Sequence, residues 1–175
     1  MRDQVRAGLF AIIQDFLPGS RFLDLFAGTG SVGIEALSRG AKSCIFVDNL
    51  PEAVRLIKRN LALLGLTSQA KVYQLDVFAA LERLYRRGRR FELIFIGPPY
   101  GQGLVGPTLA RIAELRLLEP GGLAIAEIFK KERSELQERY GPLRLIRERR
   151  YGDNLIVIYQ ASQPREEEER KEEHR

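Results

Sequence analysis

The chain has 175 residues, of which 45% are apolar and 29% are charged, which suits one domain with a single hydrophobic core. No apolar run is long enough to span a bilayer, and the N-terminus lacks the charged-then-apolar layout of a secretory signal. We therefore expect a cytoplasmic protein without membrane contact. Cys44 is the only cysteine and His174 the only histidine, so an internal disulfide is excluded and a histidine base or a resident metal is not expected.

The net charge of +5 is unevenly spread. Residues 164–175 hold four Arg or Lys and six Glu with no apolar residue, so we expect a domain over 1–163 and a charged tail that is disordered or a frayed helix. The rest of the chain is basic. A basic body fits a polyanion such as nucleic acid, but a merely solvated basic surface fits the charge equally well.

Strands and helices are expected to alternate along the chain. An opening helix carries Val5, Leu9 and Phe16 on one face and ends at Pro18. Strands are predicted at 21–26, 43–47, 71–75, 91–96 and 123–128, with helices at 31–39, 51–64, 77–87 and 104–117 between them and a short helix at 134–140. Two final strands, 143–151 and 155–160, are joined by Gly152-Asp153-Asn154, which is typical of a hairpin. The pattern predicts an α/β fold: a mainly parallel seven-stranded sheet with helices on both faces and an antiparallel hairpin at its end.

A glycine loop, Gly28-Thr29-Gly30-Ser31-Val32-Gly33, separates the first strand from the next helix. Glycines allow a ligand to approach the backbone closely, and the helix N-terminus offers free N–H groups. Asp48 follows about 20 residues after the loop begins, where an acid commonly binds ribose hydroxyls. These features indicate an adenosine-type cofactor but leave NAD and S-adenosylmethionine both open.

Two further acids stand at the ends of predicted strands. Asp24 lies in an apolar strand, where burial without a partner is costly, and a cationic amino acid moiety is a candidate partner. Asp76 could accept a hydrogen bond from an adenine amino group, although capping of the next helix is a serious rival. Capping is not expected for Asp24, because Phe26 and Ala27 separate it from the helix. The residues expected to hold the cofactor are Asp24, Phe26, Ala27, Gly28, Thr29, Gly30, Asp48, Asn49, Asp76 and Val77.

The fourth strand is followed by Gly97-Pro98-Pro99-Tyr100. Together with residues 24–41 and 151–153 this motif resembles the ribosomal RNA small subunit methyltransferase D family, and the likeness runs from Asp3 to about Gln160. It implies a Rossmann-like class I methyltransferase fold, S-adenosyl-L-methionine as donor, and methylation of the exocyclic N2 of a guanine in 16S ribosomal RNA. The implied partner is 16S rRNA or a small-subunit assembly intermediate, and we expect a monomer.

In that family the motif reads Asp or Asn, then Pro-Pro-Tyr. Carbonyl and side-chain acceptors take the N–H bonds of the amino group, the aromatic ring stacks on the base, and the prolines stiffen the loop. Gly97, Pro98, Pro99 and Tyr100 are therefore the expected catalytic positions. Gly97 departs from the family and removes the side-chain acceptor, which puts the catalytic rate in doubt. A second departure is at the N-terminus: the family usually has a β-hairpin ahead of the opening helix, whereas here Met1 falls almost at that helix, so we expect either that the segment was trimmed or that this member lacks it.

Basic residues follow the strands on the expected active edge. Lys130, Lys131 and Arg133 follow the fifth strand, and Arg149, Arg150 and Tyr151 end on the same edge if strand 143–151 runs parallel to its neighbours. RNA contacts are expected from Lys130, Lys131, Arg149, Arg150 and Tyr151. Arg86, Arg87, Arg89 and Arg90 precede the fourth strand, so we place them on the opposite edge.

Three alternatives stay open. An N-methyltransferase could act on DNA adenine or a protein amide instead, although DNA enzymes usually carry a further target-recognition domain. A cofactor-binding relative could be catalytically impaired because of Gly97. An NAD-linked oxidoreductase would need a proton-handling residue, for which only Tyr100 or a lysine is available.

Overall fold

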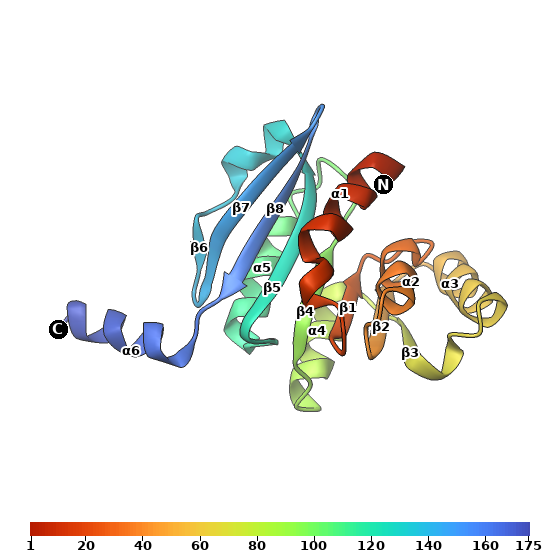
Figure 1. Ribbon diagram of the computed structural model, residues 1–175, viewed down its shortest axis with the longest axis horizontal. Coiled ribbons are helices and arrows are strands. Elements are labelled where there is room, and N and C mark those ends of the chain that lie inside the picture. Colours follow the sequence, from red (N-terminus) through yellow and green to blue (C-terminus); the bar gives the residue numbers. More distant parts are fainter.

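The computed structural model describes residues 1–175 and is built on one eight-stranded sheet with the order β3-β2-β1-β4-β5-β8-β7-β6 (Figure 1). The strands are β1 (Arg21–Leu25), β2 (Ser43–Asp48), β3 (Ala70–Gln74), β4 (Phe91–Ile96), β5 (Leu118–Phe129), β6 (Arg139–Tyr140), β7 (Leu143–Tyr151) and β8 (Asn154–Ala161). Strands β1 to β5 are parallel, whereas β8, β7 and β6 add antiparallel pairs beyond β5. The predicted α/β architecture with its closing hairpin is confirmed.

Helices cover both faces of this sheet. On one face lie α1 (Asp3–Ile13), α2 (Ser31–Ser38) and α3 (Pro51–Leu63), and on the other α4 (Val77–Arg86) and α5 (Val105–Leu115) (Figure 1). Short 3-10 helices, η1 (Gln14–Phe16), η2 (Thr67–Gln69) and η3 (Lys130–Glu135), complete the connections. Because side chains alternate along a strand, β1 sends Phe22 to the first face and Leu23 to the second. The parallel strands are therefore buried on both faces.

The region after β5 departs from the sequence prediction. The helix expected at 134–140 is wrong, because η3 and the two-residue strand β6 occupy this region. Tyr140 is buried against the ring of Tyr159, and Gly141 takes a φ of +54° in the turn that pairs β6 with β7. An extended segment allows both the contact of Tyr140 with Tyr159 and the turn at Gly141, so the sheet has eight strands instead of seven. Strand β5 also begins at Leu118, earlier than predicted, and its pairing with β4 shifts register near Phe91.

The charged tail is a helix, α6 (Pro164–Glu173), in the structure. No residue of α6 is buried, and Figure 1 shows it projecting from the body. Its attachment is polar: Glu167 accepts from Arg116 at 3.2 Å and from the Ser162 hydroxyl at 3.1 Å. None of the helices is both long enough and apolar enough to cross a membrane.

Strand direction decides which residues reach the active edge. Strand β7 is antiparallel to both of its neighbours, yet it points the same way as β5, because β8 runs against each of them. Asn154 pairs with Phe129 of β5 on one side and with Tyr151 of β7 on the other. The C-terminal ends of β5 and β7 therefore share the edge at which the glycine loop leaves β1.

Candidate active site

The glycine loop is a left-handed turn between β1 and α2. Phe26, Gly28 and Gly30 have φ angles of 58°, 59° and 78°, and the amide of Gly30 donates to the carbonyl of Ala27 at 2.8 Å. A positive φ is costly for a bulky residue such as Phe26, so the surrounding structure must hold it there. The third glycine of the motif serves packing: a Cβ on Gly33 would lie only 2.4 Å from the Phe46 ring. This close approach seats α2 against β2.

Asp48 braces the loop from the end of β2. One carboxylate oxygen accepts from the Gly28 amide at 2.9 Å, and the other accepts from the Leu50 amide at 3.0 Å. Each oxygen keeps a further lone pair. The carboxylate thus holds the loop in shape and still has capacity for a ligand's hydroxyl groups.

Asp24 is 1% exposed, and burial raises the pKa of its carboxyl to about 8. This direction agrees with the cost of burying a carboxylate that lacks a cationic partner. Asp24 is not the N-cap of α2, as expected, because Gly30 holds that position; its Oδ2 nevertheless accepts from the Gly33 amide at 3.0 Å. Gly33 is the third residue of α2, and its amide is one of the free donors of a helix N-terminus, which the left-handed loop turns back toward β1.

Asp76 caps α4. Its Oδ2 accepts from the amides of Phe78 and Ala79 at 3.0 and 3.2 Å, which is the rival role that the sequence left open. The two bonds share one oxygen of an exposed side chain. Capping and contact with a ligand are therefore compatible for Asp76.

These acids surround one cavity of about 510 Å³. It is lined by nine of the ten residues expected to hold the cofactor and by all four residues of the motif after β4: Asp24, Phe26, Ala27, Gly28, Thr29, Asp48, Asn49, Asp76, Val77, Gly97, Pro98, Pro99 and Tyr100. Gly30 is the exception and does not line the cavity. The volume lies in the range of small-molecule sites. The buried Asp24 carboxylate has no cationic partner in the protein, so it suits a ligand that carries an ammonium group.

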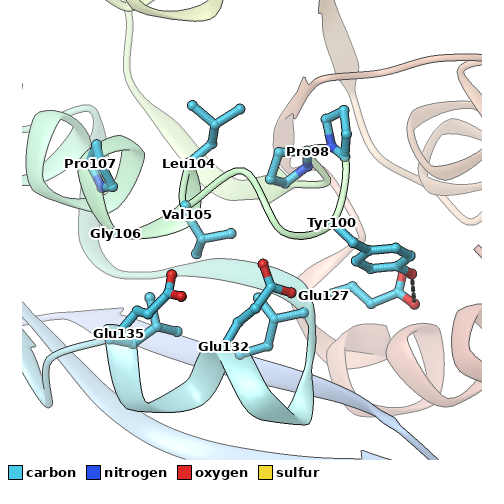
Figure 2. Close-up of a pocket in the computed structure, with 13 residues that line it drawn as sticks. Pro98, Tyr100, Leu104, Val105, Gly106, Pro107, Glu127, Glu132 and Glu135 are labelled. Carbon is cyan, nitrogen blue, oxygen red and sulfur yellow. Dashed lines mark hydrogen bonds between the residues drawn. The ribbon is translucent and has the colours of Figure 1, made fainter.

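Tyr100 closes the cavity on the side of β5. The centroid of its ring lies 4.0 Å from that of Phe129, at an interplanar angle of 31°. Its hydroxyl donates to Oε1 of Glu127 at 2.7 Å (Figure 2). The side chain remains 40% exposed. Partial burial and the Glu127 acceptor raise the pKa of the Tyr100 hydroxyl, so it stays a neutral donor at physiological pH.

The motif loop is held from η3. Oε1 of Glu132 accepts from the amide of Gly101 at 2.9 Å, and Oε2 accepts from the amide of Phe129 at 2.8 Å. Figure 2 shows Glu132 and Glu135 rising from η3 toward the loop. One carboxylate thus ties the loop after the prolines to the end of β5, which limits the loop's freedom together with the prolines themselves.

Two polar residues of the site were missed by the sequence analysis. Glu127 on β5 and Asn154 on β8 are 5% and 6% exposed, and the Asn154 amide donates to Glu127 at 2.6 Å and to the Tyr100 hydroxyl at 3.1 Å. A signal was present for Glu127, because it is the only charged residue in the apolar run from Leu123 to Phe129. Asn154 gave no such signal, since an asparagine at that position is equally typical of a hairpin turn.

Gly97 leaves room for Phe95. A Cβ on Gly97 would lie 2.7 Å from Cε1 of the Phe95 ring, which is 4% exposed and lines the same cavity. The aromatic ring therefore occupies the space from which an Asp or Asn side chain at position 97 would start.

The basic residues on this edge differ in whether an acidic side chain already pairs with them. Lys130 pairs with Asp153 at 3.0 Å, while the ammonium of Lys131 lies 5.9 Å from the centre of the Phe129 ring. Arg133 forms ion pairs with both Glu138 and Glu148, which raise its pKa.

At the end of β7 the two arginines are exposed to solvent, whereas the tyrosine that follows them is half-buried. Arg149 and Arg150 are exposed, and Arg150 donates to the carbonyl of Gly152 at 2.7 Å. Tyr151 is half-buried, with its hydroxyl at the place where a Cβ on Gly8 of α1 would lie.

Known proteins are similar to this chain in sequence and in fold. The model of a family described as "Conserved hypothetical protein 95" matches residues 1–160. A Bacillus subtilis protein named "Putative rRNA methyltransferase YlbH" is 41% identical over 157 residues, which are 90% of this chain and 84% of the relative. Ribosomal RNA small subunit methyltransferase D of Haemophilus influenzae is 32% identical over 129 residues, 73% of this chain and 66% of that protein. A solved Escherichia coli structure described as "Putative methyltransferase yhhF" superposes with a TM-score of 0.81 at 25% identity, covering 93% of this chain and 87% of the other.

Proposed function

Because the chain belongs to the family described as conserved hypothetical protein 95, the ribosomal RNA small subunit methyltransferase D family, we propose that it methylates the exocyclic N2 of a guanine in 16S ribosomal RNA. The donor is S-adenosyl-L-methionine. The resemblance noted in the sequence is confirmed by the family match. The partner is 16S rRNA, either free or within a small-subunit assembly intermediate.

One observation carries this proposal: the glycine loop with its acids and the Pro-Pro-Tyr motif line the same cavity. The loop alone is equally compatible with a nicotinamide cofactor. Pro98, Pro99 and Tyr100 add a stiff edge of backbone carbonyls and an aromatic ring beside it. That combination suits a planar base whose amino group must meet a methyl donor.

The donor would lie along the ends of β1, β2 and β3. When bound, S-adenosyl-L-methionine supplies an electrophilic methyl carbon on a sulfonium. Asp48 and Asn49 would hold the ribose, while Asp76 and Val77 would contact the adenine. Asp24 and the loop residues Phe26, Ala27, Gly28 and Thr29 would receive the amino acid end, where the Asp24 carboxylate meets its ammonium directly or through backbone and water. Gly30 would act indirectly, because its amide closes the turn by donating to the carbonyl of Ala27.

The base would lie against Tyr100. Phe129 already covers the Tyr100 ring at a centroid distance of 4.0 Å, so a target base would stack on the part that stays exposed. A backbone carbonyl beside the prolines, at Gly97 or Pro98, would accept a hydrogen bond from one N–H of the amino group. Such a hydrogen bond orients the nitrogen lone pair toward the methyl carbon, because it fixes the plane of the N–H bonds.

RNA would continue over the edge formed by η3 and the β7–β8 turn. Lys131, Arg149 and Arg150 are the freest cations there and would contact phosphates. Lys130 would contribute less, because Asp153 already pairs with it. Tyr151 would support the edge through its packing on α1 more than through direct contact.

The test is methyl transfer from labelled donor to small subunits, and in parallel to naked 16S rRNA, purified from cells that lack this protein. We expect one N2-methylguanosine per RNA from at least one of these substrates, with S-adenosylhomocysteine inhibiting and NAD having no effect. Label in adenine, DNA or protein but none in guanine would contradict the proposal.

A further inference from the structure

A polar cluster joins the motif loop to the hairpin: the half-exposed Tyr100 and the buried Glu127 and Asn154. Tyr100 and Asn154 both donate to Oε1 of Glu127, at 2.7 and 2.6 Å. The other oxygen, Oε2, receives no hydrogen bond from the protein. The only fully buried side-chain oxygen without a hydrogen-bond partner is Oε2 of Glu35, so Oε2 of Glu127 is accessible and can accept a hydrogen bond from a ligand in the cavity. Glu127 lines the same cavity as the glycine loop, so its carboxylate belongs to the wall of the site.

Sheet register places this acid beside the missing one. Ile96 of β4 pairs with Ala126 of β5, so the next residues along the two parallel strands are Gly97 and Glu127. In the motif that this segment resembles, the first position, at the end of β4, is an Asp or Asn. Here that strand ends in glycine, and an acid stands at the neighbouring position of β5. The longer Glu side chain, fixed at Oε1, makes up for the change of strand.

We propose that Glu127 is a catalytic residue of this enzyme and supplies the hydrogen-bond acceptor for the target base that Gly97 cannot. This inference rests on the proposed function. Its free Oε2 accepts from the amino group of the guanine and from the adjacent ring N1–H, two donors that lie side by side on that edge of the base. Asn154 is a positioning residue, because it holds Glu127 without lining the cavity.

The chemistry balances with this carboxylate in place. The amino nitrogen forms a bond to the methyl carbon as the carbon–sulfur bond breaks, and the sulfur keeps that electron pair and becomes a neutral thioether. The nitrogen then carries one proton too many. Glu127 Oε2, already its hydrogen-bond acceptor, takes this proton and passes it to solvent.

The same carboxylate selects the base. Guanine offers two donors on this edge, whereas adenine pairs its amino donor with a ring nitrogen that accepts. An acceptor-only group such as a carboxylate repels that ring nitrogen. Glu127 therefore favours guanine over adenine, a choice that the glycine at position 97 left undecided.

Glu127→Gln is the sharpest variant. Its side-chain oxygen would stay with the Tyr100 and Asn154 donors, so the NH₂ group would face the amino group of the base, donor against donor. We expect kcat for methyl transfer to small subunits to fall about 100-fold, as for loss of one transition-state hydrogen bond. Glu127→Asp should retain part of the activity. Glu168→Gln is the matched control, because it removes the same charge from an exposed position on α6, away from the cavity, and should change kcat less than about threefold.

A second readout does not depend on turnover. With S-adenosylhomocysteine bound, the wild-type protein should bind guanosine monophosphate about tenfold more tightly than inosine or adenosine monophosphate. The affinities are measured from the NMR chemical shifts of backbone amides in the loop after β4. Glu127→Gln should lose this preference while its affinity for S-adenosylhomocysteine stays nearly unchanged. An Asn154→Ala variant should lower kcat with little effect on KM, since it frees Glu127 without removing it.

The outcomes separate the two proposals. If the wild type methylates no guanine, the proposed function fails, and the nucleotide preference still decides the role of Glu127. If the wild type is active and Glu127→Gln keeps more than a third of its kcat, the inference is overturned. It is also overturned if the wild type shows no preference for guanosine monophosphate, or if the preference survives in Glu127→Gln.

Discussion

Replacing Asp24 with Asn should make the unliganded protein more stable and at the same time weaken its binding of the donor. The Asp24 carboxyl has a pKa of about 8 in the folded chain against an ordinary value of 3.8. Between these values the folded state holds a proton that the unfolded chain has released, so stability falls as pH rises through this window. Asn carries no such proton and can still accept from the Gly33 amide through its own oxygen.

The magnitude follows from that window. Each pH unit corresponds to about 1.4 kcal/mol, and pH 7 lies about three units above the ordinary pKa. The Asp24→Asn chain should therefore gain up to about 4 kcal/mol in unfolding free energy at pH 7 and close to nothing near pH 4. Partial structure in the unfolded chain lowers this figure, so a gain of about 2 kcal/mol still agrees.

Urea unfolding of both chains at pH 5 and pH 7.5 measures the effect, with calorimetric titration of S-adenosylhomocysteine on the same samples. The variant should bind the ligand on the order of 10- to 100-fold more weakly, as expected for one lost charge-assisted contact. Wild-type affinity should rise with pH up to about 8, because binding needs the ionised Asp24. Parallel stability curves for the two chains, or an unchanged ligand affinity, would refute the reasoning.

Three further substitutions probe other parts of the site. Gly33→Ala should cost about 1–3 kcal/mol of unfolding free energy in thermal or urea melts, because its Cβ would lie 2.4 Å from the Phe46 ring. Gly97→Asp should lower stability by a similar amount, since its Cβ would meet the Phe95 ring at 2.7 Å, and it should leave kcat within a few fold because the acceptor is already supplied from β5. Lys131→Glu should weaken binding to small subunits in filter assays and reduce the salt slope of the affinity by about one.

Each of these three predictions would be contradicted by a specific result. Gly33→Ala that melts like the wild type would mean that α2 can move away from β2. A gain of about tenfold or more in kcat from Gly97→Asp would mean that the present site is impaired and lacks its acceptor. Arg86→Glu is the control for Lys131→Glu, because Arg86 ends α4 at the opposite edge of the sheet. A larger loss of affinity from Arg86→Glu would place the RNA on that other edge.

Much of the sheet was predictable because its strands are short apolar runs separated by glycines and helix starts. The β1–loop–α2 unit is clear from Asp24 to Gly33, since both its periodicity and its glycine spacing are local features. The region from η3 to β6 was not predictable in this way. There, Arg139 and Tyr140 form a strand because of a turn at Gly141 and a buried contact with Tyr159, which lies far along the chain in β8.

In the candidate site too, some features were predictable from local sequence and others depended on contacts between distant segments. Acids at the ends of successive parallel strands were expected to meet, and Asp24, Asp48 and Asp76 do line one cavity. Their hydrogen bonds back into the loop and helices were harder to foresee, because left-handed turns decide where an amide points. The pairing of Glu127 with Asn154 depends on the register of β5 against β8, which composition does not specify.

The measurement that tests the central claim most directly is the N2-methylguanosine content of 16S rRNA from cells with and without this protein. We predict that deletion removes one such nucleoside per RNA molecule, that the wild-type chain restores it, and that the Glu127→Gln chain restores little. An unchanged content after deletion, with every N2-methylguanosine still present, would contradict the claim.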